Sequence, residues 1–311
     1  MWSVTTAALA APIGTLKQFK VPTANSQPRS ITNGSDGNRW FTEGTDFTNA
    51  PAKLGRITPA GVVTEFPADC NFCILTGVAQ GPGSILYLTS NNPDLLRFDI
   101  ATSTFLTSVP MPNSNALAGE IAIAGDDIWI TDFNNDVVWR YRISTGLFSS
   151  VPVTDPADVA VDQGGNAWFT QPESNGSGTG TIGRIEAATM AVTTTQVNAA
   201  ARGIAVATDG QVWFTARFTP QAVGRLDPVT GIVTIFPLTT EGPQSIAASP
   251  DGSMWFTLTT KGSIANITNA GVVTEGKAVK GSQPFEVVVA ANGDPWYTML
   301  SANKVATLQL R

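Results

Sequence analysis

Short apolar runs separated by turn residues recur along the whole chain and predict β-strands rather than helices. The clearest run is Trp-Phe-Thr preceded by Asp-Gly, at residues 36–43, 209–216 and 251–258. Related copies occupy residues 126–132, 165–171 and 293–299, and a seventh at 83–90 has tyrosine in place of tryptophan. The anchors lie 39 to 47 residues apart, which is typical of propeller blades; they are Trp40, Tyr87, Trp129, Trp168, Trp213, Trp255 and Trp296.

Each repeat contains four short strand patterns. An apolar run comes first, the Asp-Gly or Gly-Asn pair suits a tight hairpin, and Trp-Phe-Thr forms the second strand. The third pattern is apolar-Gly-Arg-apolar, as at 54–57, 182–185 and 223–226, and the fourth resembles residues 61–66 and 231–236. We therefore predict an all-β chain that folds as one seven-bladed β-propeller with four-stranded blades.

The two ends of the chain predict how the ring closes. The seventh repeat, residues 284–310, has room for only three strands, whereas residues 14–19 resemble a fourth strand without a blade. We expect this N-terminal strand to complete the last blade, which removes free sheet edges. Residues 13–311 then form the propeller. Residues 1–12 are an N-terminal extension or the remnant of a signal peptide, since residues 8–10 resemble a cleavage site.

Composition narrows the functional classes. A net charge of −6 disfavours nucleic acid as a partner, and no apolar run is long enough to span a membrane. The sequence has no histidine, which excludes Ser-His-Asp and Cys-His catalysis and imidazole metal ligands. Three glycosylation sequons, at Asn33, Asn175 and Asn266, favour a secreted glycoprotein. We expect a monomer that acts on a small organic molecule.

Several conspicuous residues have structural interpretations. Cys70 and Cys73 favour a local disulfide; two free thiols are the alternative, and a zinc site would need more ligands. Six tryptophans share one repeat position, which favours packing between blades over an aromatic binding box. Five arginines also share one position, and a repeated structural hydrogen bond or ion pair is favoured over an anion-binding ring; they are Arg56, Arg97, Arg140, Arg184 and Arg225.

Residues that break the repeat are the candidates for a site over the central channel. Two positions are expected to reach it: two residues before the first-strand apolar marker, and directly after Trp-Phe-Thr. Among these residues, the predicted catalytic side chains are Arg29, Glu43, Arg202 and Gln244. The predicted substrate-binding side chains are Thr76, Asp132, Gln171, Phe285 and Met299. Together they would form a half-polar, half-apolar cavity. The alternative is a solvated channel without a ligand.

The repeat units together resemble the streptogramin (virginiamycin B) lyase family. That resemblance implies a metal-assisted elimination on a cyclic depsipeptide, with Mg²⁺ and a Glu-x-His…Trp-Phe-x-Glu motif. Blade four comes nearest but has Asp155, Ala157 and Gln171 at the motif positions, and blade one has Gln27, Arg29 and Glu43. The complete set is absent from every blade, so we predict no metal and no cofactor.

Three functions follow from this departure. The first is metal-independent processing of a natural product, a cyclisation of hetero-Diels–Alder type that works by positioning and carbonyl polarisation. The chain resembles lyase-like propellers of fungal natural-product pathways in this respect. The second is a C–O lyase or lactone-opening enzyme with Glu43 or Asp132 as base. The third is a secreted, non-catalytic binding propeller.

Overall fold

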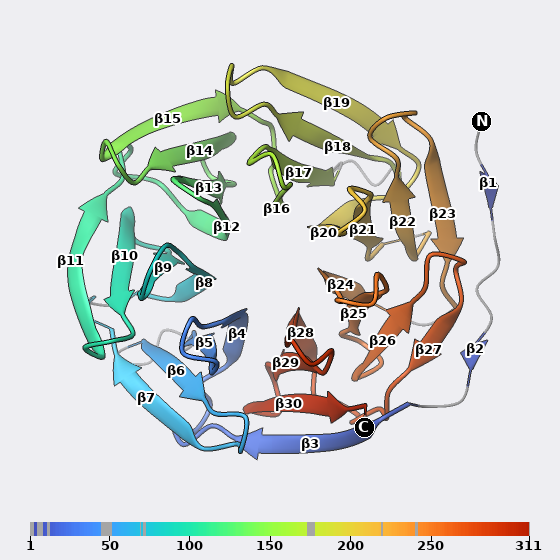
Figure 1. Cartoon of the computed structure of the whole chain (residues 1–311), viewed down its shortest axis with the longest axis horizontal. Helices are drawn as coiled ribbons and strands as arrows, with labels where there is room; N and C mark the ends of the chain where they lie inside the picture. Colours follow the sequence, from blue (N-terminus) through green and yellow to red (C-terminus); the bar gives the residue numbers. More distant parts are fainter. Residues whose placement is uncertain are drawn as a thin grey trace.

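The computed structural model describes residues 3–4, 9–10, 13–44, 52–68, 70, 73–172, 178–218, 220–239 and 242–310. All of the regular secondary structure within these ranges is β-strand, and the strands form seven sheets around a central axis (Figure 1). The predicted all-β seven-bladed propeller is confirmed. No helix in the described ranges is of a length and apolarity that would cross a membrane.

The inner half of each blade is an antiparallel hairpin, with its first strand beside the central axis. The innermost strands are β4 (Pro28–Asn33), β8 (Leu75–Gln80), β12 (Ala118–Ala124), β16 (Asp158–Val161), β20 (Ala201–Val206), β24 (Pro243–Ala248) and β28 (Pro284–Val289). The second strands are β5 (Arg39–Glu43), β9 (Ile85–Ser90), β13 (Asp127–Asp132), β17 (Ala167–Pro172), β21 (Val212–Ala216), β25 (Met254–Leu258) and β29 (Pro295–Met299).

The outer half of each blade continues the antiparallel order. The third strands are β6 (Lys53–Ile57), β10 (Asp94–Asp99), β14 (Val137–Arg142), β18 (Gly180–Ile185), β22 (Ala222–Leu226), β26 (Ser263–Ile267) and β30 (Lys304–Gln309). The outer strands are β7 (Val63–Pro67), β11 (Thr104–Pro110), β15 (Leu147–Pro152), β19 (Val192–Val197), β23 (Val233–Pro237), β27 (Val273–Glu275) and β3 (Thr15–Lys20).

The ring closes through the N-terminal strand, as predicted. Strand β3 pairs antiparallel with β30, so that Thr15 lies opposite Gln309 and Lys20 opposite Lys304. Beyond this pair, the Asn303 side chain accepts hydrogen bonds from the backbone N–H and hydroxyl of Ser26 at 2.8 and 2.9 Å. These bonds join the last blade to the segment that enters the first, so both ends of the chain stabilise the closed ring.

The N-terminal segment adds a feature that the repeat pattern does not contain. Strand β1 (Ser3–Val4) pairs parallel with β23, and β2 (Leu9–Ala10) pairs parallel with β27. These two short strands therefore add a fifth strand to the outer edges of blades 5 and 6 (Figure 1). Its origin in a signal peptide stays a prediction, and the sequon at Asn175 lies outside the described residues.

The repeated tryptophans have the packing role expected of them, and the repeated arginines contact them. The six anchor tryptophans are buried, each at most 6% exposed. The repeated arginines lie over four of them, as in the pairs Arg140 with Trp129 at 5.3 Å and Arg225 with Trp213 at 5.3 Å, and Arg39 lies over a fifth, Trp296. Such cation–π contacts explain why the arginine recurs with the tryptophan. Cys70 and Cys73 form the expected disulfide.

The glycine of the third strand is explained by close packing. A Cβ atom on Gly55 or Gly183 would lie 2.2 or 1.9 Å from Cζ of the phenylalanine in the same blade's Trp-Phe-Thr. Any larger side chain would displace that buried ring, because interiors are packed at crystal-like density. In the Gly-Arg pair, the glycine therefore leaves room for the phenylalanine ring, and the arginine places its guanidinium group over the tryptophan ring.

The threonine of each second strand fixes the innermost strand. In all seven blades its hydroxyl accepts a hydrogen bond from a backbone N–H near the start of that innermost strand, at 2.8 to 3.2 Å. Five of these hydroxyls also donate to a carbonyl on the next blade's innermost strand; they are Thr89, Thr170, Thr215, Thr257 and Thr298. One hydroxyl thus satisfies a donor in its own blade and an acceptor in the neighbouring blade.

Replacement of one such hydroxyl by a methyl group should destabilise the ring. Thr215 is fully buried, accepts from Gly203 N–H at 2.9 Å and donates to the Gln244 carbonyl at 2.7 Å. Thr215→Val leaves both backbone groups without their partner, so we expect a loss of roughly 1–3 kcal/mol in the free energy of unfolding. Urea denaturation measures it. Thr194→Val, on the exposed outer strand, is the control, and equal losses in both variants would contradict this role.

Candidate functional site

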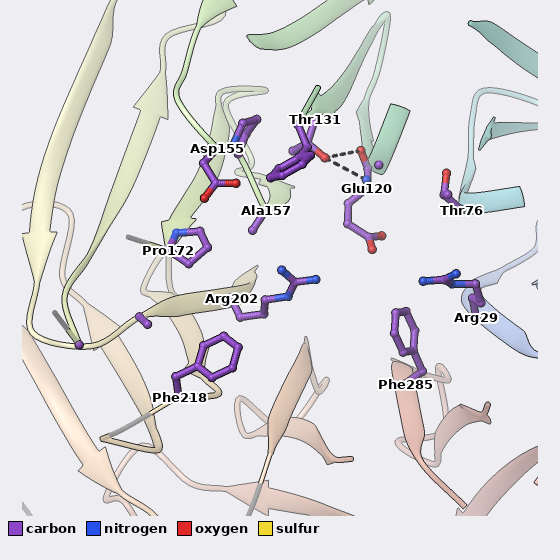
Figure 2. Close-up of a pocket in the computed structure, with 15 residues that line it drawn as sticks. Arg29, Thr76, Glu120, Thr131, Asp155, Ala157, Pro172, Arg202, Phe218 and Phe285 are labelled. Atoms are coloured by element: carbon purple, nitrogen blue, oxygen red, sulfur yellow. Dashed lines mark hydrogen bonds between the residues drawn. The ribbon is translucent and has the colours of Figure 1, made fainter. Parts of the chain in front are cut away.

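A cavity of about 750 Å³ opens over the central channel, on the face where the innermost strands begin (Figure 2). Blades 1 to 5 and blade 7 supply its walls. The lining residues are Arg29, Thr76, Gly119, Glu120, Thr131, Phe133, Asp155, Pro156, Ala157, Pro172, Gly178, Ala200, Arg202, Phe218 and Phe285. Below it, a narrower space of about 120 Å³ continues between the innermost strands.

A β-bulge at the inner end of the first strand positions the lining residues. The pairing register shifts there in six blades, for example between Pro28 and Ile31 and between Ala201 and Ile204. In a bulge two residues oppose one on the partner strand, so strict alternation of side chains is interrupted. Arg29 and Arg202 each occupy the first of the two bulge positions, where their side chains project over the hub.

The first predicted set of residues is brought together by this geometry. Arg29, Thr76, Arg202 and Phe285 line the main cavity, and the Arg29 guanidinium lies 5.1 Å from the centre of the Phe285 ring. Gln244 lines only the narrower space below. Its Oε1 accepts a hydrogen bond from Arg217 at 2.9 Å, so this amide is held by a protein partner.

The second predicted position does not reach the cavity. Glu43, Asp132 and Met299 are fully buried, and Gln171 donates its amide to the Thr154 carbonyl at 2.7 Å. None of these four residues is among those that line the main cavity. The preceding threonine points towards the neighbouring blade, so alternation directs the next side chain to the opposite face of the sheet. The roles assigned to these four residues in binding or catalysis stay predictions.

Two of these buried residues carry carboxyl groups in different surroundings. Asp132 accepts hydrogen bonds from the Trp139 indole at 2.9 Å and the Asn135 amide at 2.8 Å, which is a structural role. Burial, followed by repulsion from Glu65, raises the pKa of Glu43 to about 8. The nearby Lys53 ammonium is paired with Glu65 at 2.8 Å.

Three carboxyl groups at the hub were missed by the sequence analysis. Glu120, Asp158 and Glu286 follow Gly119, Ala157 and Phe285 on the innermost strands, and they face the narrow space. Four other blades have Ser or Gly at this position, at residues 30, 77, 203 and 245. An acidic residue at a position where the other blades have a small one is the signal that could have revealed them. To use this signal, one must know that the residue after the predicted lining position also reaches the hub.

Asp158 has a structural role in this group. Its two carboxylate oxygens accept the backbone N–H groups of Val159 at 2.7 Å and Ile204 at 2.9 Å, which connects blades 4 and 5. Burial raises the pKa of Asp158 to about 6, while these two hydrogen bonds and Arg202 act in the opposite direction. Burial and then Glu120 raise the pKa of Glu286 well above its ordinary value.

Among these three hub carboxyl groups, Glu120 lines the main cavity, and Asp155 lines it as well. The Glu120 side chain points between the guanidinium groups of Arg29 and Arg202 (Figure 2). Burial, followed by repulsion from Asp158, raises the pKa of Glu120 to about 8, although the two arginines act to lower it. At neutral pH a large share of this group is therefore protonated and able to donate a hydrogen bond.

The cavity walls mix apolar and charged groups. Phe133, Phe218 and Phe285 contribute rings, and the first two are 60% and 61% exposed at the rim. Pro156 and Ala157 add apolar surface between blades 3 and 5. Arg29 and Arg202 approach from opposite sides of the hub, and neither guanidinium donates a hydrogen bond to another residue drawn in Figure 2. The cavity thus offers two facing cationic donors among apolar side chains.

The residues present do not fit the Mg²⁺ that the family resemblance implies. No group of three or more Asp, Glu or Cys side chains within the described ranges is arranged to hold a metal ion. The nearest candidates are the hub carboxyl groups, but both oxygens of Asp158 already accept backbone hydrogen bonds. Two arginines at the same hub add positive charge, which opposes cation binding.

Fold and site together define the chain as a streptogramin lyase-like β-propeller. The model of the Virginiamycin B lyase family matches residues 8–179 and 149–311, and the chain belongs to this family. A virginiamycin B lyase from Nocardia farcinica (strain IFM 10152) is 28% identical over 153 residues, which is 49% of this chain and 51% of that protein. The chain therefore spans about half the length of this curated relative.

Solved structures show the same fold. A streptogramin B lyase structure superimposes with a TM-score of 0.83 at 22% identity, covering 96% of this chain and 98% of that one. Virginiamycin B lyase from Staphylococcus aureus gives 0.82 at 20% identity, with 96% and 99% covered. Its catalytically inactive histidine-to-alanine variant with quinupristin gives 0.81 at 20% identity and the same coverage.

The raised pKa of Glu120 predicts a pH dependence of stability. In the unfolded chain this carboxyl group ionises near its ordinary pKa, whereas in the folded protein it ionises near 8. The unfolded state therefore binds fewer protons between these values, and the stability contributed by the protonated group is lost as the pH rises from about 5 to 8. Glu120→Gln should make the melting temperature fall less over this range.

Calorimetric scans at pH 5 and pH 8 test this expectation. Asp209→Asn, at an exposed turn, is the control and should keep the decline of the unchanged protein. A Glu120→Gln variant whose melting temperature declines as steeply as that of the unchanged protein would contradict the assignment. Because Asp158 and Glu286 share the hub, only part of the slope should disappear in this variant.

Proposed function

We propose that the chain processes a small natural product in the hub cavity by a cyclisation of hetero-Diels–Alder type. The observation that carries the proposal is the facing pair Arg29 and Arg202, whose guanidinium groups project into a cavity that phenylalanine rings also line (Figure 2). Such donors can polarise a carbonyl oxygen as charge develops on it. The phenylalanine rings can hold a hydrocarbon partner beside it.

This reaction suits the side chains at the site. A hetero-Diels–Alder step forms one C–C and one C–O bond from existing π bonds, and no proton or electron leaves the reactants. The protein must then hold two reactants in contact, which supplies much of the barrier reduction. Protonated Glu120 can add a hydrogen bond to the carbonyl oxygen, between the two arginines. Phe285 and the rim phenylalanines would orient the apolar reactant.

The comparisons support a departure from the family's own chemistry. The virginiamycin B lyase variant in which a histidine is replaced by alanine is described as catalytically inactive. The present chain has no histidine anywhere, and Ala157 lines the cavity at the motif position where the resemblance expects one. A reaction that needs neither a general-base histidine nor a metal is therefore favoured.

Incubation with a polyene and a quinone-methide-type partner tests the cyclisation. We expect product faster than in buffer and with one stereoisomer in excess. Arg202→Gln should reduce the rate on the order of 100-fold, because a donor to the developing charge is lost. Arg225→Gln in the same blade, remote from the cavity, should leave the rate unchanged. Racemic product at the buffer rate would exclude this function.

A second candidate is a C–O lyase or lactone-opening enzyme, and the pKa of Glu120 favours it specifically. A carboxyl group that ionises near pH 8 inside a cavity can act as a general base, a role that the buried Glu43 and Asp132 are less well placed to perform. The third candidate, a binding propeller, predicts that a bound ligand is recovered unchanged.

The pH profile separates these candidates. If Glu120 acts as a hydrogen-bond donor, the rate should fall as the pH rises through about 8; if it acts as a base, the rate should rise over the same range. Steady-state rates between pH 6 and 9, with the polyene pair and with a cyclic depsipeptide, give the sign. A profile unchanged by Glu120→Gln would exclude both roles for this residue.

A further inference from the structure

Three blades share an aromatic pair that blade 4 lacks. In blades 1, 5 and 7 the outer strand carries a phenylalanine that packs on the anchor tryptophan of the same blade. The ring centroids are 5.5 Å apart for Phe66 and Trp40, 5.7 Å for Phe236 and Trp213, and 5.7 Å for Phe19 and Trp296. Each phenylalanine occupies the same register, opposite the first apolar residue of the Gly-Arg motif or its counterpart in the third strand.

In blade 4 this register position holds Thr195. It pairs with Ile182, whose strand places Arg184 opposite Trp168, just as Phe236 pairs with Val223 in blade 5. The short side chain opens a groove of about 540 Å³ between blades 4 and 5. Its walls include Trp168, Ile182, Arg184, Thr193, Thr195 and Leu226. Trp168, on the inner wall of the groove, is 6% exposed.

In blades 1, 5 and 6, the turn between the third and outer strands lies next to the preceding blade. The glycines of these turns show independently whether that neighbouring space is filled. A Cβ atom on Gly61 would lie 1.9 Å from the Phe19 ring, and one on Gly271 would lie 2.6 Å from the Phe236 ring. Both turns therefore cover the phenylalanine of the preceding blade. The corresponding turn of blade 5, one residue longer, carries Gly231, whose Cβ would meet no atom within 4 Å. The ring that blades 1, 5 and 7 provide is thus not replaced at this turn by another ring of the described residues.

The arginine that lies over each tryptophan indicates which kind of ligand the groove would bind. Arg225 lies 5.3 Å from the Trp213 ring and 5.9 Å from the Phe236 ring, so its guanidinium contacts both partners. Arg184 lies 5.8 Å from the Trp168 ring and has no second ring among the described residues. A planar aromatic ring in the groove would complete this arrangement, because aromatic faces attract both cations and other rings. Thr193 and Thr195 place hydroxyl groups on the same wall.

We propose that the groove between blades 4 and 5 binds a small aromatic molecule that carries a hydroxyl group, with its ring in the place that phenylalanine takes in blades 1, 5 and 7. The site shares no lining residue with the hub cavity. It is therefore independent of the function proposed for that cavity. Its ligand would be selected by flatness, since the part of the groove next to Trp168 and Arg184 corresponds to the place of one phenylalanine side chain.

Calorimetric titration of the full chain with benzyl alcohol tests this site. We expect one saturable site with a Kd on the order of millimolar, as suits a ligand of this size. Thr195→Phe supplies the missing ring from the chain itself and should weaken binding at least 10-fold. It should also raise the melting temperature, because it fills a cavity. Thr194→Phe, one residue away and exposed on the outer strand, should keep both values unchanged.

Thr195→Leu is the second variant, for the case that Thr195→Phe does not fold; it should fill part of the groove and weaken binding to a smaller degree. Soaked crystals should show the ring beside Trp168. Saturable binding that persists in both Thr195 variants, or an unchanged protein that shows no saturable binding, would overturn the proposal. So would cyclohexylmethanol binding as tightly as benzyl alcohol, because a saturated ring is not flat.

Discussion

The hydroxyl of one repeated threonine holds the hub of this protein together. Each threonine at this position of the second strand accepts a backbone N–H from its own innermost strand, and five of them donate to the carbonyl of the next blade's bulge. The innermost strands of seven blades converge on the channel at this point. A bulge left without these bonds would expose unpaired backbone groups at low dielectric, which is costly. The hydrogen bonds that hold the bulges therefore also hold the site residues in place.

This constraint explains how the cavity combines charges that would otherwise be separated. Arg29, Glu120 and Arg202 all stand on bulges, so three blades direct ionisable groups at one small volume. Burial there raises the pKa of Glu120 to about 8, and the arginines only partly offset this rise. The hub thus holds an acid that is neutral in part at physiological pH between two permanent cations. Such a group can serve as a donor or a base, and its substrate decides which.

The sequence predicted the blades well because each is a local pattern. Strand alternation, the Asp-Gly turn and the aromatic anchor act over about 40 residues, and their repetition reinforces every assignment. Gly37 and Gly210 adopt positive φ values of 77° and 84° in the expected hairpins. The site was predicted less well. Arg29, Thr76, Arg202 and Phe285 line the cavity, whereas Glu43 and Met299 are buried and Glu120 was not recognised.

From the sequence alone came the number of blades, the closure by the N-terminal strand, the packing roles of the tryptophans and the absence of histidine chemistry. All of these depend on residue type and spacing. The tertiary structure decided which side chains reach the hub, how far the pKa of Glu120 shifts, and where Thr195 leaves a groove. These depend on bulge register, on burial and on what the neighbouring blade supplies, and such contacts between distant residues have no fixed spacing along the chain.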